Sequence, residues 1–177
     1  MTLTFLANLL GAGLIAFGGS CFLLKETHGK TFQEWLRNER LGLWVFTIAH
    51  LWFFVNLWRV DEKDCESFKS LLFLFFLFAF LGCAFYWKDF IIVRGIAVLT
   101  ALTVHRALWV GYMEAHILRP YVSGLFYFWI VLAVLFGLNP YLARDFVHAL
   151  FQKNRLWLRS IAVASIFYGF LLIGLAL

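Results

Sequence analysis

The sequence contains little charge, little proline and few cysteines, and each shortage excludes a class of protein. Only 14% of its 177 residues are charged whereas 63% are hydrophobic, so a water-exposed domain has too little polar surface to form. Two prolines and the absence of Ser-rich or low-complexity stretches leave no linker that would divide the chain. We therefore expect a single integral membrane domain over residues 1–177.

Cysteine and catalytic motifs are also scarce. Cys21, Cys65 and Cys83 form neither a CxxC pair nor a disulfide framework. The sequence contains no Gly-rich dinucleotide fingerprint, no P-loop, no HExxH zinc motif and no nucleophile elbow. We therefore expect neither a metal site nor the activity of a soluble enzyme.

Long hydrophobic runs make up most of what is present. A helix needs about 20 apolar residues to cross the roughly 30 Å hydrocarbon core, and in lipid the backbone must satisfy its own hydrogen bonds. Six segments meet or approach this length: residues 3–24, 41–58, 69–87, 91–112, 121–138 and 157–177. The pattern predicts an all-α protein, a polytopic transmembrane helix bundle with six membrane helices.

The fourth segment is the least regular of the six. Arg94 lies near its start and His105 with Arg106 interrupts it, so that only residues 95–104 are free of charge. That stretch is too short to span a bilayer alone. Either the helix continues through Arg106 to Tyr112, or this segment re-enters and leaves five crossings.

The distribution of basic residues predicts the orientation. Loops rich in Lys and Arg stay in the cytoplasm. The first, third and fifth loops, with the adjoining helix ends, carry ten of the 15 basic residues, against five on the other side. Both termini are therefore expected outside the cytoplasm, in a membrane of the bacterial inner-membrane type. The net charge of +5 is explained by topology and by contact with lipid, and it does not indicate a nucleic-acid partner.

Two amphipathic stretches in the basic loops predict short helices lying on the membrane surface. Thr31 and Glu34 fit a capping box for the first helix, and Asn139 with Pro140 supplies an N-cap and a first-turn proline for the second. Such helices either anchor the bundle in anionic headgroups or dock a partner subunit. The residues predicted to make that contact are Trp35, Arg37, Arg40, Arg144, Phe146 and Lys153.

Small residues mark where membrane helices approach closely. The predicted stripes are Ala12, Ala16 and Ser20 in the first helix, Ala97 and Ala101 in the fourth, and Ser165 and Gly169 in the sixth. The third segment is the opposite case, because its phenylalanines cover every side of the helix. A helix that is apolar all round faces lipid, a hydrophobic partner, or both.

Two histidines lie inside predicted membrane helices. His50 is ten residues beyond Arg40 in the second helix, and His105 is eleven beyond Arg94 in the fourth. These helices run parallel in the six-helix arrangement, so the two imidazoles are expected at similar depth, as axial ligands of haem b or a chlorin would require. His105 shares a face with Ala101 and is therefore expected to point inward. Histidines hydrogen-bonded between helices, and proton or quinone contacts, are the other interpretations.

Arg106 is the other informative polar residue within the membrane segments. Glu114 lies two turns further along on a nearby face, so the two side chains pair, or Arg106 extends outward to the headgroups. A functional alternative has His105, Arg106 and Glu114 lining a polar entry to a quinone or an anionic lipid. Thr47 and Asn56 in the second helix are candidates for further polar contacts.

Three functions fit these features. We favour a non-catalytic accessory or scaffold subunit of a larger membrane protein complex, because the chain is small, has short loops and offers Phe-rich and small-residue helix faces. Its expected partners are membrane lipids and other membrane subunits or further copies of itself, and no cofactor is expected. The first alternative is a redox or cofactor-binding protein that uses His50 and His105. The second is a small transporter, for which only the irregular fourth helix is an indication.

Overall fold

The computed structural model of the chain describes residues 2–24, 26–60, 68–86, 88–112, 116–153 and 155–176. This part of the chain is helical and contains no strand. Its elements are α1 (Leu3–Leu23), α2 (Glu26–Leu36), α3 (Glu39–Trp58), α5 (Lys69–Phe85), α6 (Ile91–Gly111), α7 (Leu118–Leu138), α8 (Pro140–His148), the π-helical turn η1 (Ala149–Lys153) and α9 (Arg155–Ala176). The six predicted hydrophobic segments begin and end within three residues of the six longest of these helices.

Within the described ranges, five helices are long and apolar enough to cross a membrane: α1, α3, α6, α7 and α9. The fourth predicted segment is among them, because α6 continues without interruption through His105 and Arg106 to Gly111. No re-entrant break occurs in α6. The shorter segment is instead α5, which has 17 residues, about 25 Å of helix at 1.5 Å per residue.

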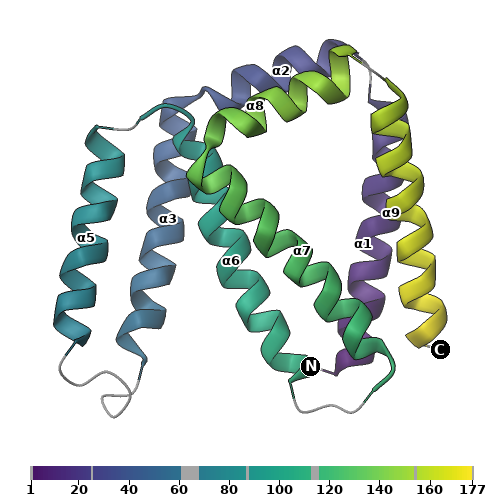
Figure 1. Ribbon diagram of the computed structural model, residues 1–177, viewed down its shortest axis with the longest axis horizontal. Helices are drawn as coiled ribbons and strands as arrows, with labels where there is room; N and C mark the ends of the chain where they lie inside the picture. The colour runs from purple at the N-terminus through teal and green to yellow at the C-terminus, as the bar shows by residue number, and fades with distance from the viewer. Residues whose placement is uncertain are drawn as a thin grey trace.

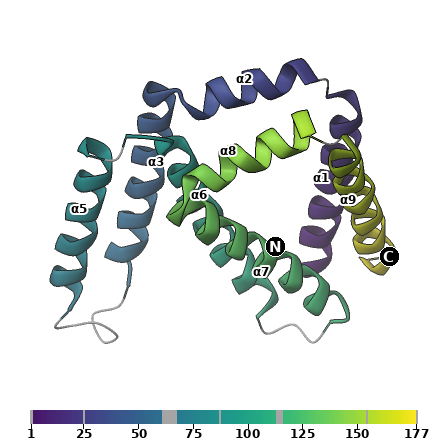
Figure 2. The same ribbon diagram turned by 45° about the horizontal axis from the view of Figure 1, so that its top comes forward.

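The long helices alternate in direction, so that both termini lie at one end of the molecule, and α6 and α7 approach α1 and α9 near that end (Figure 1). The short helices α2 and α8 lie across the opposite end, and Figure 2 shows them running next to each other. Near the end that holds the termini, a core of buried residues joins α1 and α9 to α6 and α7. Its members are Leu3, Leu6, Ala7, Val104, Leu118, Val122, Phe126 and Leu172.

The most extensive helix pair is α1 with α9. A Cβ added to Gly11 would lie 2.8 Å from the backbone oxygen of Gly169, and one added to Gly169 would lie 2.7 Å from that of Gly11. The two backbones therefore touch at reciprocal glycines, as in other close membrane helix pairs. The buried positions follow the same sequence spacing in both helices: Ala7, Gly11, Gly18 and Cys21 in α1, and Leu158, Ala162, Gly169 and Leu172 in α9.

This interface does not use the predicted small-residue stripe of α1. Ala12, Ala16 and Ser20 are exposed on the side of α1 away from α9, and the seam runs through Gly11 and Gly18 instead. The predicted contribution of Gly169 is confirmed, since Gly169 is buried. A one-residue displacement along a helix rotates the face by about 100°, and sequence spacing did not distinguish the two faces.

The parallel pair α3 and α6 is joined by a second pair of glycines. A Cβ on Gly95 would lie 2.8 Å from the backbone nitrogen of Phe46, and one on Gly42 would lie 2.9 Å from that of Ile92. Phe46 is fully buried in this contact. Because each glycine meets backbone atoms of the facing helix, the two helices approach as closely as α1 and α9 do.

By contrast, α5 is attached through aromatic rings and has no buried residue. The rings of Phe53 and Phe76 have centroids 4.7 Å apart, and those of Phe54 and Phe73 are 4.8 Å apart. Phe80 stacks on Phe46 at 5.4 Å. The phenylalanines on the other sides of α5 are exposed, in agreement with the prediction that this helix faces lipid, a partner, or both.

The middle of α2 packs against η1, the turn that follows α8. Phe32 of α2 stacks on Phe151 of η1 with centroids 5.9 Å apart, and Gly29 lies against the same phenylalanine. The prediction of a capping box at Thr31 is wrong, because α2 begins at Glu26 and Thr31 lies inside it. Pro140 occupies the first turn of α8 as predicted.

Candidate functional site

Two cavities lie beside the contact between α6 and α7. The first, here called the α8 cavity, has a volume of about 350 Å³ and lies against α8. The second, the α5 groove, has a volume of about 480 Å³ and lies between α3, α5, α6 and α7. Ala97 and Ala133 line both, so small side chains separate two spaces that fall within the size range of ligand pockets.

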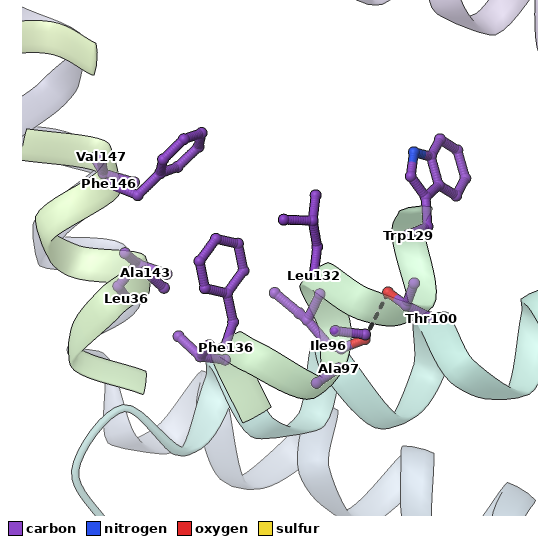
Figure 3. Close-up of a pocket in the computed structure, with 12 residues that line it drawn as sticks. Leu36, Ile96, Ala97, Thr100, Trp129, Leu132, Phe136, Ala143, Phe146 and Val147 are labelled. Atoms are coloured by element: carbon purple, nitrogen blue, oxygen red, sulfur yellow. Dashed lines mark hydrogen bonds between the residues drawn. The ribbon is translucent and has the colours of Figure 1, made fainter. Parts of the chain in front are cut away.

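The α8 cavity is lined almost entirely by hydrocarbon. Phe136 of α7 and Phe146 of α8 lie at its edge with ring centroids 5.8 Å apart (Figure 3). Thr100 donates its hydroxyl to the backbone oxygen of Ile96 at 2.8 Å, so that this polar group is satisfied within α6. Such a lining suits an acyl chain or an apolar side chain and offers little to a polar substrate.

The α5 groove differs because polar groups lie toward one end. Arg94, in the first turn of α6, and Cys83, near the end of α5, line the groove at the end of the bundle where α2 and α8 lie. His50, in the middle of α3, lines it further along. Arg94 is the charged residue among those that line the groove, and it already takes part in an interaction within the chain.

His50 is held by its own helix and by aromatic neighbours. Its Nδ1 lies 2.9 Å from the backbone oxygen of Phe46. Because a carbonyl oxygen only accepts, Nδ1 donates this hydrogen bond, and Nε2 of the neutral ring remains an acceptor. The imidazole lies 4.0 Å from the ring of Phe46 and 5.0 Å from that of Phe80. His50 thus belongs to the aromatic contact between α3 and α5.

His50 and His105 do not lie at the same depth, and that prediction is wrong. Gly95 of α6 packs against Phe46 of α3, which places His50 level with about residue 99 of α6, one helical turn beyond Gly95. His105 lies about six residues further along, or ~9 Å. Its side chain is also exposed and does not point inward as predicted. The structure does not bring the two imidazoles together as a pair of axial ligands.

Arg106 is bonded across helices to a residue of α3. Its Nη2 donates to Oδ1 of Asn56 at 3.1 Å, and Asn56 Nδ2 donates to the backbone oxygen of Trp52 at 2.8 Å. Asn56 was expected to make polar contacts, but its pairing with Arg106 was not predicted. Glu114 lies outside the described residues, so its pairing with Arg106 stays a prediction.

The residues predicted to dock a partner or lipid are in different situations. Trp35, Arg37 and Arg40 are exposed. Arg144 is already engaged, because its Nη2 lies 2.7 Å from Oδ1 of Asp145. Phe146 lines the α8 cavity. The remaining one is Lys153, in η1, whose side chain lies outside what the structure describes.

Asn8 is a polar residue that the sequence analysis missed. It lies in the second turn of α1 with an exposed side chain, and this side chain makes no hydrogen bond within the described part of the chain. Asn8 precedes Ala12, Ala16 and Ser20 at steps of four, so all four share one face of α1. This four-residue spacing is visible in the sequence and is the signal that could have identified Asn8.

Five membrane-length apolar helices define the class of this molecule as an α-helical, multi-pass membrane protein. Over the described ranges, no group of three or more His, Cys, Asp or Glu side chains is placed to hold a metal ion. No protein-family model matches the chain, and neither the curated proteins nor the solved structures include a significant match to it. The proposals below therefore rest on the geometry of the chain itself.

Proposed function

We propose that this protein is a non-catalytic accessory or scaffold subunit of a larger membrane complex, and that the outer face of α1 docks a transmembrane helix. The observation that carries the proposal is the amide of Asn8, which makes no hydrogen bond to any described residue and lies at the head of a small-residue stripe. The stripe consists of Ala12, Ala16 and Ser20, which are all exposed.

Both parts of this face favour a helix over lipid. A lipid chain cannot bond to the amide of Asn8, whereas a facing helix can offer a carbonyl or a polar side chain, and such bonds join membrane helices. Small side chains allow a second backbone to approach. Gly13 and Gly19, which flank the stripe, have open space around them, since a Cβ added to either would meet nothing within 4 Å. The opposite face of α1 already uses this type of packing against α9.

The outward surface of α9 differs from this face of α1 and is better suited to lipid. Its exposed residues include Val163, Phe167 and Phe170, with 57%, 70% and 62% of their surface accessible. These bulky side chains suit contact with flexible lipid chains and keep another backbone at a distance. The inferred docking face is therefore confined to α1.

The test is native mass spectrometry of the protein extracted gently from its own membrane. The wild-type chain is expected in a complex with a second copy or another subunit, and the masses identify which. Asn8→Leu and Ala16→Leu should each reduce the complex about five- to thirtyfold, since an interhelical hydrogen bond and close packing are each worth on the order of 1–2 kcal/mol. The matched control is Ala164→Leu, which adds the same side chain at an exposed position of α9 and should leave the complex intact. A monomeric wild-type protein, or equal effects of Ala16→Leu and Ala164→Leu, contradicts the proposal.

We further propose that the protein lies in a bacterial inner membrane with α5 as a sixth crossing. In this arrangement α2 and α8 lie in the cytoplasmic headgroup layer. Support comes from the basic residues in the loops at that end and from the alignment of α5 beside α3 (Figure 1). Single cysteines at Lys30 and Lys88, in a background without the native cysteines, should react with an impermeant maleimide from the same side. Labelling from opposite sides would refute the six-helix arrangement.

A further inference from the structure

We infer that the α8 cavity binds a neutral, lipid-soluble quinone, with one quinone carbonyl accepting a hydrogen bond from Trp129 and the tail of the molecule leaving toward the membrane. The cavity is separate from the outer face of α1, so this inference does not depend on the subunit role proposed above. It rests on an indole N–H without an acceptor, on the depth of that group in α7 and on the uncharged lining.

Trp129 brings a hydrogen-bond donor to a lining made almost entirely of hydrocarbon. Its indole N–H makes no hydrogen bond within the described part of the chain, and the nitrogen is not sealed off by packed side chains. Figure 3 shows this nitrogen on the edge of the ring that is turned toward the other lining residues. Thr100 donates its hydroxyl to the backbone oxygen of Ile96 instead. Because a tryptophan N–H away from water normally finds an acceptor, a ligand that carries one is favoured here.

The depth of Trp129 selects the kind of molecule that can bring the acceptor. Trp129 is the twelfth of the 21 residues of α7, about 15 Å along the helix from either end, and therefore lies near the middle of a membrane crossing. The ester carbonyls of a phospholipid lie at the edge of a hydrocarbon core about 30 Å thick, so they do not reach this depth. A molecule that dissolves wholly in the core can place a carbonyl there.

The uncharged lining selects a neutral ligand. Thr100 and Trp129 are the residues with a polar side-chain atom among those that line the cavity, and the rest are aliphatic or phenylalanine. An ion placed among them would lose its hydration and gain no opposite charge, which disfavours a fatty-acid carboxylate. A quinone is neutral, dissolves in hydrocarbon and has carbonyl oxygens that accept a hydrogen bond. It therefore meets the requirements of donor, depth and charge together.

The dimensions of the cavity suit a substituted ring. The lining runs along α6 from Val93 to Thr100, about 10 Å, and encloses a volume of about 350 Å³. Val93 and Ala143 are buried, so this wall is part of the packed interior. Phe136 and Phe146 lie at the edge of the cavity (Figure 3), where their rings can contact a flat ligand. Phe146 is 45% exposed, so a long tail leaves the cavity on this side.

The experiment titrates the purified full-length protein in detergent micelles with decylubiquinone and, separately, with decylbenzene, which has the same tail and no carbonyl. Bound ligand is counted by native mass spectrometry. The wild-type protein should bind the quinone about fivefold more tightly, as expected for one hydrogen bond. Trp129→Phe keeps an aromatic ring without the N–H and should remove this preference. The matched control is Trp109→Phe, at an exposed position of α6 outside the cavity, which should keep it.

A second variant tests occupation of the cavity separately from the hydrogen bond. Ile96 lines the cavity and is 39% exposed, so Ile96→Trp adds bulk at its opening while leaving Trp129 in place. This variant should weaken the binding of both compounds about tenfold. Size-exclusion elution and helical circular dichroism establish that each variant is folded. Equal binding of the two compounds by the wild type, an unchanged preference in Trp129→Phe, or unchanged binding in Ile96→Trp would each overturn the inference.

Discussion

Replacing Gly11 of α1 with alanine tests the packing on which the arrangement of α1 and α9 depends. The added Cβ would lie 2.8 Å from the backbone oxygen of Gly169 and 2.7 Å from Cγ1 of Ile173. The isoleucine side chain can rotate away, but the backbone oxygen moves only with its helix. To restore an ordinary contact of at least 3.4 Å, α1 and α9 must separate by about 0.6 Å at this point.

The expected loss of stability in Gly11→Ala follows from the rigidity of the interface between α1 and α9. Overpacking of this kind costs about 1–3 kcal/mol, because neighbouring contacts are lost when the backbones shift. Alanine also has a higher helix propensity than glycine, by up to about 1 kcal/mol, and this term opposes the clash. Gly13→Ala provides the control, because a Cβ there meets nothing within 4 Å. The propensity term is common to both variants, so Gly11→Ala should be less stable than Gly13→Ala by about 1–3 kcal/mol.

The assay is reversible unfolding in mixed micelles, with a denaturing detergent as titrant and tryptophan fluorescence as the signal. Gly169→Ala and Gly174→Ala repeat the comparison on α9, since Gly174 also has open space where its Cβ would lie. If the buried and open positions of each helix gave equal stabilities, the close contact between α1 and α9 would not exist in the folded protein.

Two further predictions concern polar contacts of α3. A double-mutant cycle on Asn56→Leu and Arg106→Met should give a coupling free energy of about 0.5–1.5 kcal/mol in the same unfolding assay, and strictly additive effects would show that the hydrogen bond between α3 and α6 is not formed. His50→Ala removes two ring contacts and should lower the free energy of unfolding by about 1–3 kcal/mol, whereas His50→Phe keeps a ring against Phe46 and Phe80 and should remain closer to wild type. Equal losses in both His50 variants would instead indicate that the stability comes from the imidazole hydrogen bond to Phe46 within α3 and not from the ring packing against α5.

The positions of the helices were largely predictable from sequence, while their faces were not. The six hydrophobic segments match the observed helices closely, and Gly169 was correctly assigned to an interface. The stripe of Ala12, Ala16 and Ser20 does not face α9, since glycine and alanine both permit close approach and only the facing helix decides which face of α1 it uses.

The candidate site was only partly predictable. His50 was singled out because a histidine in a hydrophobic segment is unusual, and it does line the α5 groove. Its predicted partner was His105, however, because the similar separations of the two histidines from Arg40 and Arg94 predict similar depth. The start of α6 is displaced relative to α3, so that Gly95 lies opposite Phe46. Because that displacement depends on how the two helices pack, no short stretch of either helix sequence indicates it.

The sequence by itself determined that this protein is helical and has several segments suited to lipid. Transfer of apolar side chains from water and the internal bonding of a helical backbone are properties of each segment, and they are read from about 20 consecutive residues. Only the tertiary structure decided that Arg94 and His50 share a groove, that Arg106 bonds Asn56, and that Asn8 faces outward. Those outcomes depend on the rotation and axial offset of helices packed at close range, where a shift of one residue brings a different set of side chains into contact.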